Sequence, residues 1–330
     1  VINSSTNTSI LGISKHPLSY TFRQTLINKS DLMIQMTTTL TPFTIQTFHK
    51  LFDREEMEAN IEATVELAAA SPEGLYYFMQ RYAHFNGFAG SLVARLASSI
   101  GISRDLFNQS DIPVADQADR GLNIAAKVLA ATIDEHADDG AQQVTHRTLA
   151  QVTMNAIGDY AGLNNTERNK IAQAPDWLQP ILVGLLAGYQ GVIGDLEGLV
   201  VALGFHIGSE LLADREYALI DQVVRYNHRD EGFDAYLQGK QVEIGGKRLS
   251  PWYWIVVHGK HNSTGVEAEH CQLAIDALNL MTEYRPESAA TILEWASKGF
   301  LDFARIQHQL FFDSAAEIRS LKTRQLVSAG

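Results

Sequence analysis

Carboxylates and histidines occur in three groups along the chain, and each group falls within or at the end of an expected helix. Helical bundles hold pairs of iron or manganese ions with carboxylates, which neutralise the cations, and with neutral imidazoles, which complete each coordination shell. The sequence therefore predicts a metal site among these groups. They are Glu135 with His146, Glu197 with Asp195 and His206, and Glu267 with Glu269 and His270.

Helix geometry selects which members of the third group can act together. Residues three or four apart lie on one face of a helix, so Glu267 and His270 can point at one ion while Glu269 points away. Ser263 lies four residues before Glu267 on that same face. The pattern Glu-x-x-His is one that helical bundles use for metal ligands.

Glu197 is surrounded in sequence by apolar residues, including Leu196, Leu199 and Val200. Burial of an unpaired carboxylate costs several kcal/mol. We therefore expect Glu197 to be buried and to have a cation or another strong partner. The other acids also have plainer explanations: Glu135 as a solvated loop residue, and Glu267 as a first-turn acid that stabilises the helix dipole.

The pattern of apolar residues predicts helices over most of the chain after residue 55. Residues 1–55 read as an irregular arm with at most one short helix. Start signals stand at Asp53, at Ser71-Pro72 and at Asn164. The expected helices cover about 75–100, 119–135, 145–160, 181–211, 214–226, 262–283 and 287–326, with a short helix after Asn164.

Residues 227–256 interrupt this helical pattern. Gly245-Gly246 separates two short strand-like runs, 241–244 and 247–249, which is a two-residue hairpin signal. The fold class predicted is all-α, with residues 56–330 as one helical domain that carries a small β-hairpin insertion around 240–250.

Composition excludes several classes of partner. A net charge of −12 argues against a nucleic acid or an anionic membrane, since both need a clustered cationic surface. The single cysteine, Cys271, lies in an apolar helical run and reads as core. We find no basic leader and no uninterrupted apolar span, so we expect a cytoplasmic protein without a membrane segment.

Taken in order, the segments over about 60–285 resemble the heme-oxygenase-like di-iron oxidases, also described as iron-containing redox enzymes. The aromatic run 78–85 is similar to the first core helix of that family, and the run from Asn123 through Glu135 to His146 is similar to its ligand-bearing second and third helices. The resemblance implies a heme-oxygenase-like helical bundle and a homodimer. It implies iron ligands at Glu135, His146, Glu197, Glu267 and His270.

The chain departs from the family pattern at two places. The last core helix of the family bears His-x-x-x-Asp-x-x-His, and here Ser263, Glu267 and His270 stand at those positions. His258 or His261, from the preceding turn, are candidates to replace the missing histidine. The first core helix offers Gln80 and His84 where the family has a glutamate. The number of bound ions, zero, one or two, stays open.

The resemblance implies a non-heme iron oxidase or oxygenase that uses O2 on a small organic substrate. The substrate pocket would be lined from the first core helix by Tyr77, Phe78, Tyr82, His84 and Phe85, although an ordinary core helix shows the same stripe. Two other functions fit the residues. One is a metal-independent enzyme that uses Glu197, Glu267 and His270 as acid–base groups. The other is a non-catalytic protein that binds a small molecule.

Overall fold

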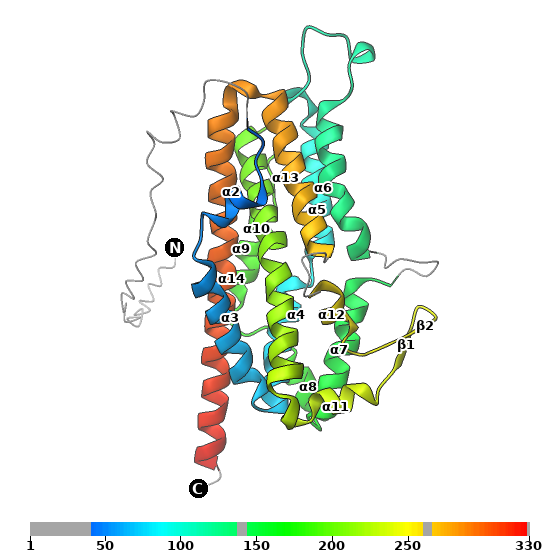
Figure 1. Cartoon of the computed structure of the whole chain (residues 1–330), viewed down its shortest axis with the longest axis vertical. Helices are drawn as coiled ribbons and strands as arrows, with labels where there is room; N and C mark the ends of the chain where they lie inside the picture. The colour runs from blue at the N-terminus through cyan, green and yellow to red at the C-terminus, as the bar shows by residue number, and fades with distance from the viewer. Residues whose placement is uncertain (1–40, 137–143, 260–265, 329–330) are drawn as a thin grey trace, which may run out of the picture. The chain divides into compact units, whose positions relative to one another are not determined.

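The computed structural model describes residues 41–136, 144–259 and 266–328, which fall in the unit Thr39–Gly330. These residues form helices and one two-stranded sheet (Figure 1), so the all-α prediction is confirmed. The first half contains α2 (Ile45–His49), α3 (Arg54–Ala69), α4 (Pro72–Asn86), α5 (Ala89–Ile102), η1 (Arg104–Leu106), η2 (Val114–Asp116), α6 (Arg120–His136), α7 (His146–Tyr160) and α8 (Asn165–Ile171). The second half contains α9 (Gln179–Gly188), α10 (Leu196–Asp221), η3 (Gln222–Asn227), η4 (Arg229–Glu231), α11 (Phe233–Gln238), β1 (Val242–Ile244), β2 (Lys247–Leu249), α12 (Tyr253–His258), α13 (Val266–Tyr284), η5 (Pro286–Ser288) and α14 (Ala289–Ser328).

Helix starts that the sequence predicts are confirmed. The side chains of Asp53, Ser71 and Asn164 each accept a hydrogen bond from a backbone N–H in the first turn of α3, α4 and α8. Such caps satisfy donors that have no partner inside the helix.

Two helices predicted as continuous are broken. The helix expected at 75–100 divides at Gly87 into α4 and α5, and the helix expected at 181–211 divides into α9 and α10. Between α9 and α10, Gly191 and Gly194 have φ values of +49° and +79°. Glycine adopts these left-handed conformations without steric cost, so the chain reverses there. The break places the start of α10 at Leu196.

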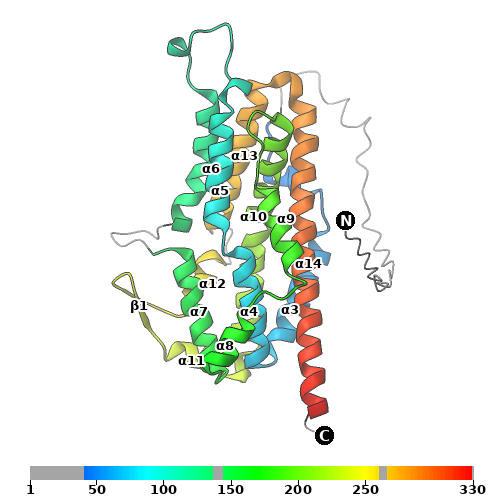
Figure 2. The ribbon, with the colours of Figure 1, turned by 180° about the vertical axis from the view of Figure 1, so that it is seen from behind.

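Helix α10 lies at the centre of the packing and contacts α3, α5, α9, α12, α13 and α14. Figures 1 and 2 show it running between α13 and α14. The closest approach is to α14, where two glycines face the other helix. A Cβ at Gly204 would collide with the carbonyl oxygen of Ala296, and one at Gly299 with that of Val201.

The predicted hairpin is confirmed at β1 and β2. Ile244 pairs with Lys247 next to the two-residue turn, and Gly245 and Gly246 have φ values of +58° and +76°. A turn with two positive φ values matches the twist of an antiparallel pair. The surrounding 227–256 segment is more helical than expected, because α11 and α12 lie on either side of the hairpin.

One described helical segment, Leu196–Asn227, is long and apolar enough by length and composition to cross a membrane. Sixty-one per cent of its most apolar window is buried inside the protein. A buried core helix meets the same criterion, and the central place of α10 explains why this segment does.

We predict that Gly299→Ala lowers the free energy of unfolding by about 2–4 kcal/mol, because the new methyl group collides with backbone rather than with a mobile side chain. Urea denaturation measures the change. Gly184→Ala is the control, since its nearest new neighbour, Ile306 Cδ1, would lie 3.5 Å away in ordinary contact. That variant should be neutral or gain up to about 1 kcal/mol. Equal effects of the two substitutions would contradict the close α10–α14 contact.

Candidate metal centre

Three buried side chains from two packed helices come together at the centre of the described structure. Glu210 lies on α10, and Glu267 and His270 lie on α13. One ligand atom from each lies within 4.8 Å of the other two. His270 Nδ1 is 3.4 Å from Glu210 Oε2 and 3.9 Å from Glu267 Oε2. This buried Glu–Glu–His group could hold a metal ion.

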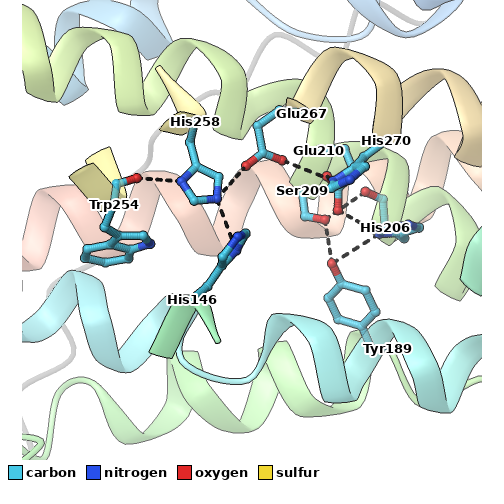
Figure 3. A network of polar contacts seen from close by, with 9 residues as sticks. All are labelled: His146, Tyr189, His206, Ser209, Glu210, Trp254, His258, Glu267 and His270. Carbon is cyan, nitrogen blue, oxygen red and sulfur yellow. Dashed lines mark hydrogen bonds and ion pairs between the residues drawn. The ribbon is translucent and has the colours of Figure 1, made fainter. Parts of the chain in front are cut away.

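Two further histidines that could be metal ligands, His258 and His146, lie on the other side of Glu267 (Figure 3). His258 Nε2 is 3.6 Å from Glu267 Oε1 and 3.2 Å from His146 Nδ1. His258 Nδ1 donates a hydrogen bond of 2.6 Å to the Trp254 carbonyl oxygen. Because that bond fixes the Nδ1 proton, a neutral His258 directs the lone pair of Nε2 toward Glu267 and His146. His258 Nε2 and Glu267 Oε1 are then both acceptors, and a proton or a metal cation between them would remove their repulsion.

Glu267 therefore has a central position in the cluster. Its Oε2 faces His270, and its Oε1 faces His258. A carboxylate whose two oxygens face different sets of ligands has the arrangement of a bridging ligand.

Side chains of α10 and of Tyr189, the residue that follows α9, surround the Glu210 end of the cluster. His206 Nδ1 is 3.2 Å from Glu210 Oε1, and Tyr189 Oη is 3.5 Å from the same nitrogen. Tyr189 Oη is also 2.5 Å from Ser209 Oγ, which donates to the His206 carbonyl oxygen at 2.8 Å. These contacts fix the orientation of His206 and, through it, of Glu210.

The charge on Glu210 is favoured by its neighbours. Burial by itself would raise the pKa of Glu210, but the charge of His206 and the hydrogen bond from His270 hold this pKa well below its usual value. The ionised form is the one that binds metal cations.

A cavity of about 230 Å³ adjoins this cluster. Glu210, Glu267 and His146 line it together with aromatic side chains such as Phe85 and Trp254. A small organic molecule bound in this cavity would therefore lie against the candidate ligands.

A third buried carboxyl group, Glu216, also lines the cavity and is 2% exposed. Gln307 Nε2 donates a hydrogen bond to Glu216 Oε2. The hydroxyl of Tyr82 and the amide of Asn86 lie beside the same carboxyl without well-aligned hydrogen bonds. Burial raises the pKa of Glu216 to about 7, and these neutral neighbours offset only part of the effect.

Three of the predicted ligands meet in the cluster: His146, Glu267 and His270. His258, one of two candidates for the missing family histidine, also lies in it. His261, the other candidate, and Ser263 lie outside the described residues, as does the side chain of Glu135 in the last turn of α6.

The expectation that Glu197 is a buried ligand is wrong. Glu197 is exposed in the first turn of α10, thirteen residues and about 20 Å along the helix from Glu210. The break between α9 and α10 explains the error, because it places Glu197 at a helix end that the sequence pattern put in mid-helix.

The predicted pocket lining is largely wrong as well. Phe85 lines the cavity, but the other four residues do not. Phe78 and Tyr82 pack in the core against each other and against Phe311. The Arg81 guanidinium covers the Tyr77 ring, and His84 Nε2 contacts the Ala172 carbonyl oxygen at 2.7 Å.

Sequence reasoning missed Glu210 and Glu216. A signal for Glu210 existed, since it follows the buried His206 by four residues and so shares its face of α10. No such spacing in the sequence points to Glu216, because its neighbours Tyr82 and Gln307 come from distant parts of the chain. Cys271 is buried as expected, and burial raises the pKa of its thiol far from reactive values.

Comparison of the chain with protein-family models, with curated proteins and with solved structures finds no match in any of the three. Function therefore has to be inferred from the geometry of the cluster and its cavity.

We predict that Glu216→Gln stabilises the metal-free protein at alkaline pH. The pKa of Glu216 is about 7 when folded and near 4.5 when unfolded, so the native state binds more protons between these values and its stability falls as pH rises through them. At pH 8.5 the neutral amide should raise the free energy of unfolding by on the order of 3 kcal/mol, and near pH 4.5 by almost nothing. Urea denaturation across this pH range measures it. The exposed Glu197→Gln should show no such pH dependence, and a pH-independent effect of Glu216→Gln would contradict the prediction.

Proposed function

We propose that this protein is a non-heme iron oxidase that uses O2 to oxidise a small organic molecule bound in the cavity. The observation that carries the proposal is the buried group Glu210, Glu267 and His270 beside a cavity of about 230 Å³. Buried acids need a cation, and a cavity at the same point offers a place for a substrate.

The donor set fits iron. Carboxylate oxygens and imidazole nitrogens together suit Fe(II) and Mn(II), whereas the cluster offers no thiolate of the kind that selects softer ions. Glu210, Glu267 and His270 would hold one ion. Glu267 Oε1, His258 Nε2 and His146 Nδ1 would hold a second, with Glu267 as the bridge. Bound iron supplies O2 binding and one-electron transfer.

The chain's own residues would orient this centre and limit access to it. The bond from His258 Nδ1 to Trp254 keeps the Nε2 lone pair available, as outer hydrogen bonds do for metal-bound histidines. His206 contacts Glu210 and is itself contacted by the Tyr189 hydroxyl, and these two contacts hold the Glu210 carboxylate in place. The buried surroundings exclude bulk water from the cluster.

The heme-oxygenase-like fold is part of the proposal. Its support is the helical architecture and one buried cluster in which His146 on α7 contacts His258, which in turn lies beside Glu267 on α13.

A metal-independent acid–base enzyme is the second candidate. It is favoured by the ion pairs that Glu210 already makes with His206 and His270, and by the pKa of about 7 of Glu216. A group with a pKa near the operating pH is suited to proton transfer. In this alternative the cluster would be stable and active without metal.

We predict that protein loaded anaerobically with Fe(II) retains iron after desalting and consumes O2 when exposed to air. His270→Ala should reduce both the retained iron and the rate of O2 consumption by more than about tenfold, because it removes a ligand from the buried group. Iron analysis and an oxygen electrode measure the two quantities.

Glu197→Ala is the control, since this exposed acid lies far from the cluster, and it should match the wild type. Failure of the wild-type protein to retain iron would contradict the proposal. Turnover of a substrate that persists in EDTA would favour the acid–base enzyme.

A further inference from the structure

Three described carboxylates line the cavity, and Glu216 differs from the other two because its described hydrogen-bonding neighbours are all neutral and none is a histidine. Glu210 and Glu267 lie beside histidines. The partners of Glu216 are the neutral side chains of Tyr82, Asn86 and Gln307. Arg147 also lines the cavity, but its guanidinium donates to the Ala83 carbonyl oxygen. Within the part of the chain that the structure describes, no lysine, arginine or histidine side chain makes an ion pair with Glu216.

Three buried polar atoms without a hydrogen-bond partner among the described residues belong to the side chains beside Glu216. Asn86 Nδ2, Gln307 Oε1 and Tyr82 Oη are buried and make no aligned hydrogen bond within the described structure. Buried polar atoms without partners each cost about 1–3 kcal/mol, and of these three residues Asn86 also lines the cavity. Within the cavity the ionised Glu216 carboxylate is an acceptor, so the group that complements it is a donor with N–H bonds.

Aromatic side chains line the cavity together with Glu216. Tyr217 and Trp254 line it, and Tyr82 packs between them with ring centroids 5.5 Å and 5.7 Å away. The faces of aromatic rings attract cations, and aromatic cages are a common way to bind ammonium groups. A carboxylate that lines the same cavity as the aromatic side chains Tyr217 and Trp254 favours a cation with an organic body over a bare metal ion.

We infer that the cavity binds the protonated amine of a small organic substrate, with Glu216 as its counterion. The inference rests on the proposed function only for the claim that the bound amine is the substrate. Glu216 lies six residues after Glu210, about 9 Å along α10. An amine held at Glu216 would thus extend a short carbon chain toward the metal cluster, where oxidation would occur.

The test compares three probes of equal length: n-butylammonium, n-butanol and butyrate. Ligand-observed NMR titration at pH 7.5 with metal-free protein in EDTA gives the dissociation constant of each. We expect n-butylammonium to bind at least about tenfold more tightly than either of the other two. Glu216→Gln should abolish this preference while retaining the fold, and Glu197→Gln should retain the preference.

Failure of this inference is distinguishable from failure of the proposed function. His270→Ala removes a metal ligand and should keep the preference for n-butylammonium. If the wild type retains no iron but prefers the ammonium probe, the oxidase proposal fails and the amine site stands. The amine site is overturned if Glu216→Gln keeps the preference, if n-butanol binds as tightly, or if no probe shows saturable binding.

Discussion

Burial of carboxylates is the constraint on which the rest of this structure depends. Glu210 and Glu267 lie in the interior of a helical protein, where each ionised acid costs several kcal/mol unless a cation accompanies it. Histidines from α7, α10, α12 and α13 surround the two acids and supply ligands or protons. Because Glu267 faces histidines with both oxygens, it connects the two halves of the cluster.

Packing outside the cluster brings helices α7, α10, α12 and α13 together. Glycines at the α10–α14 crossing let the two backbones approach, which fixes α10 in the centre of the described helices. The chain reversal at Gly191 and Gly194 sets where α10 begins and so which of its residues face α13. The same helix then presents Glu210 to the cluster of acids and histidines, and both Glu210 and Glu216 to the cavity.

The features predicted correctly from the sequence are those that depend on residues close together in the chain. The spacing of Glu267 and His270 placed both on one helix face, Gly245-Gly246 specified the hairpin turn, and Asp53 began its helix as a cap. The choice between Glu197 and Glu210 could not be made in this way. Helix α10 is apolar on nearly every side, so its pattern has no inward face, and only its contacts with α13 and α9 decide which acid is buried.

The most direct test of the central claim, that the buried acids and histidines hold metal, is anomalous diffraction at the iron edge from crystals of the Fe(II)-loaded protein. We expect a peak within bonding distance of Glu210, Glu267 and His270, and a second between Glu267, His258 and His146. A well-ordered cluster with no anomalous peak, its acids paired with the histidines alone, would contradict that claim.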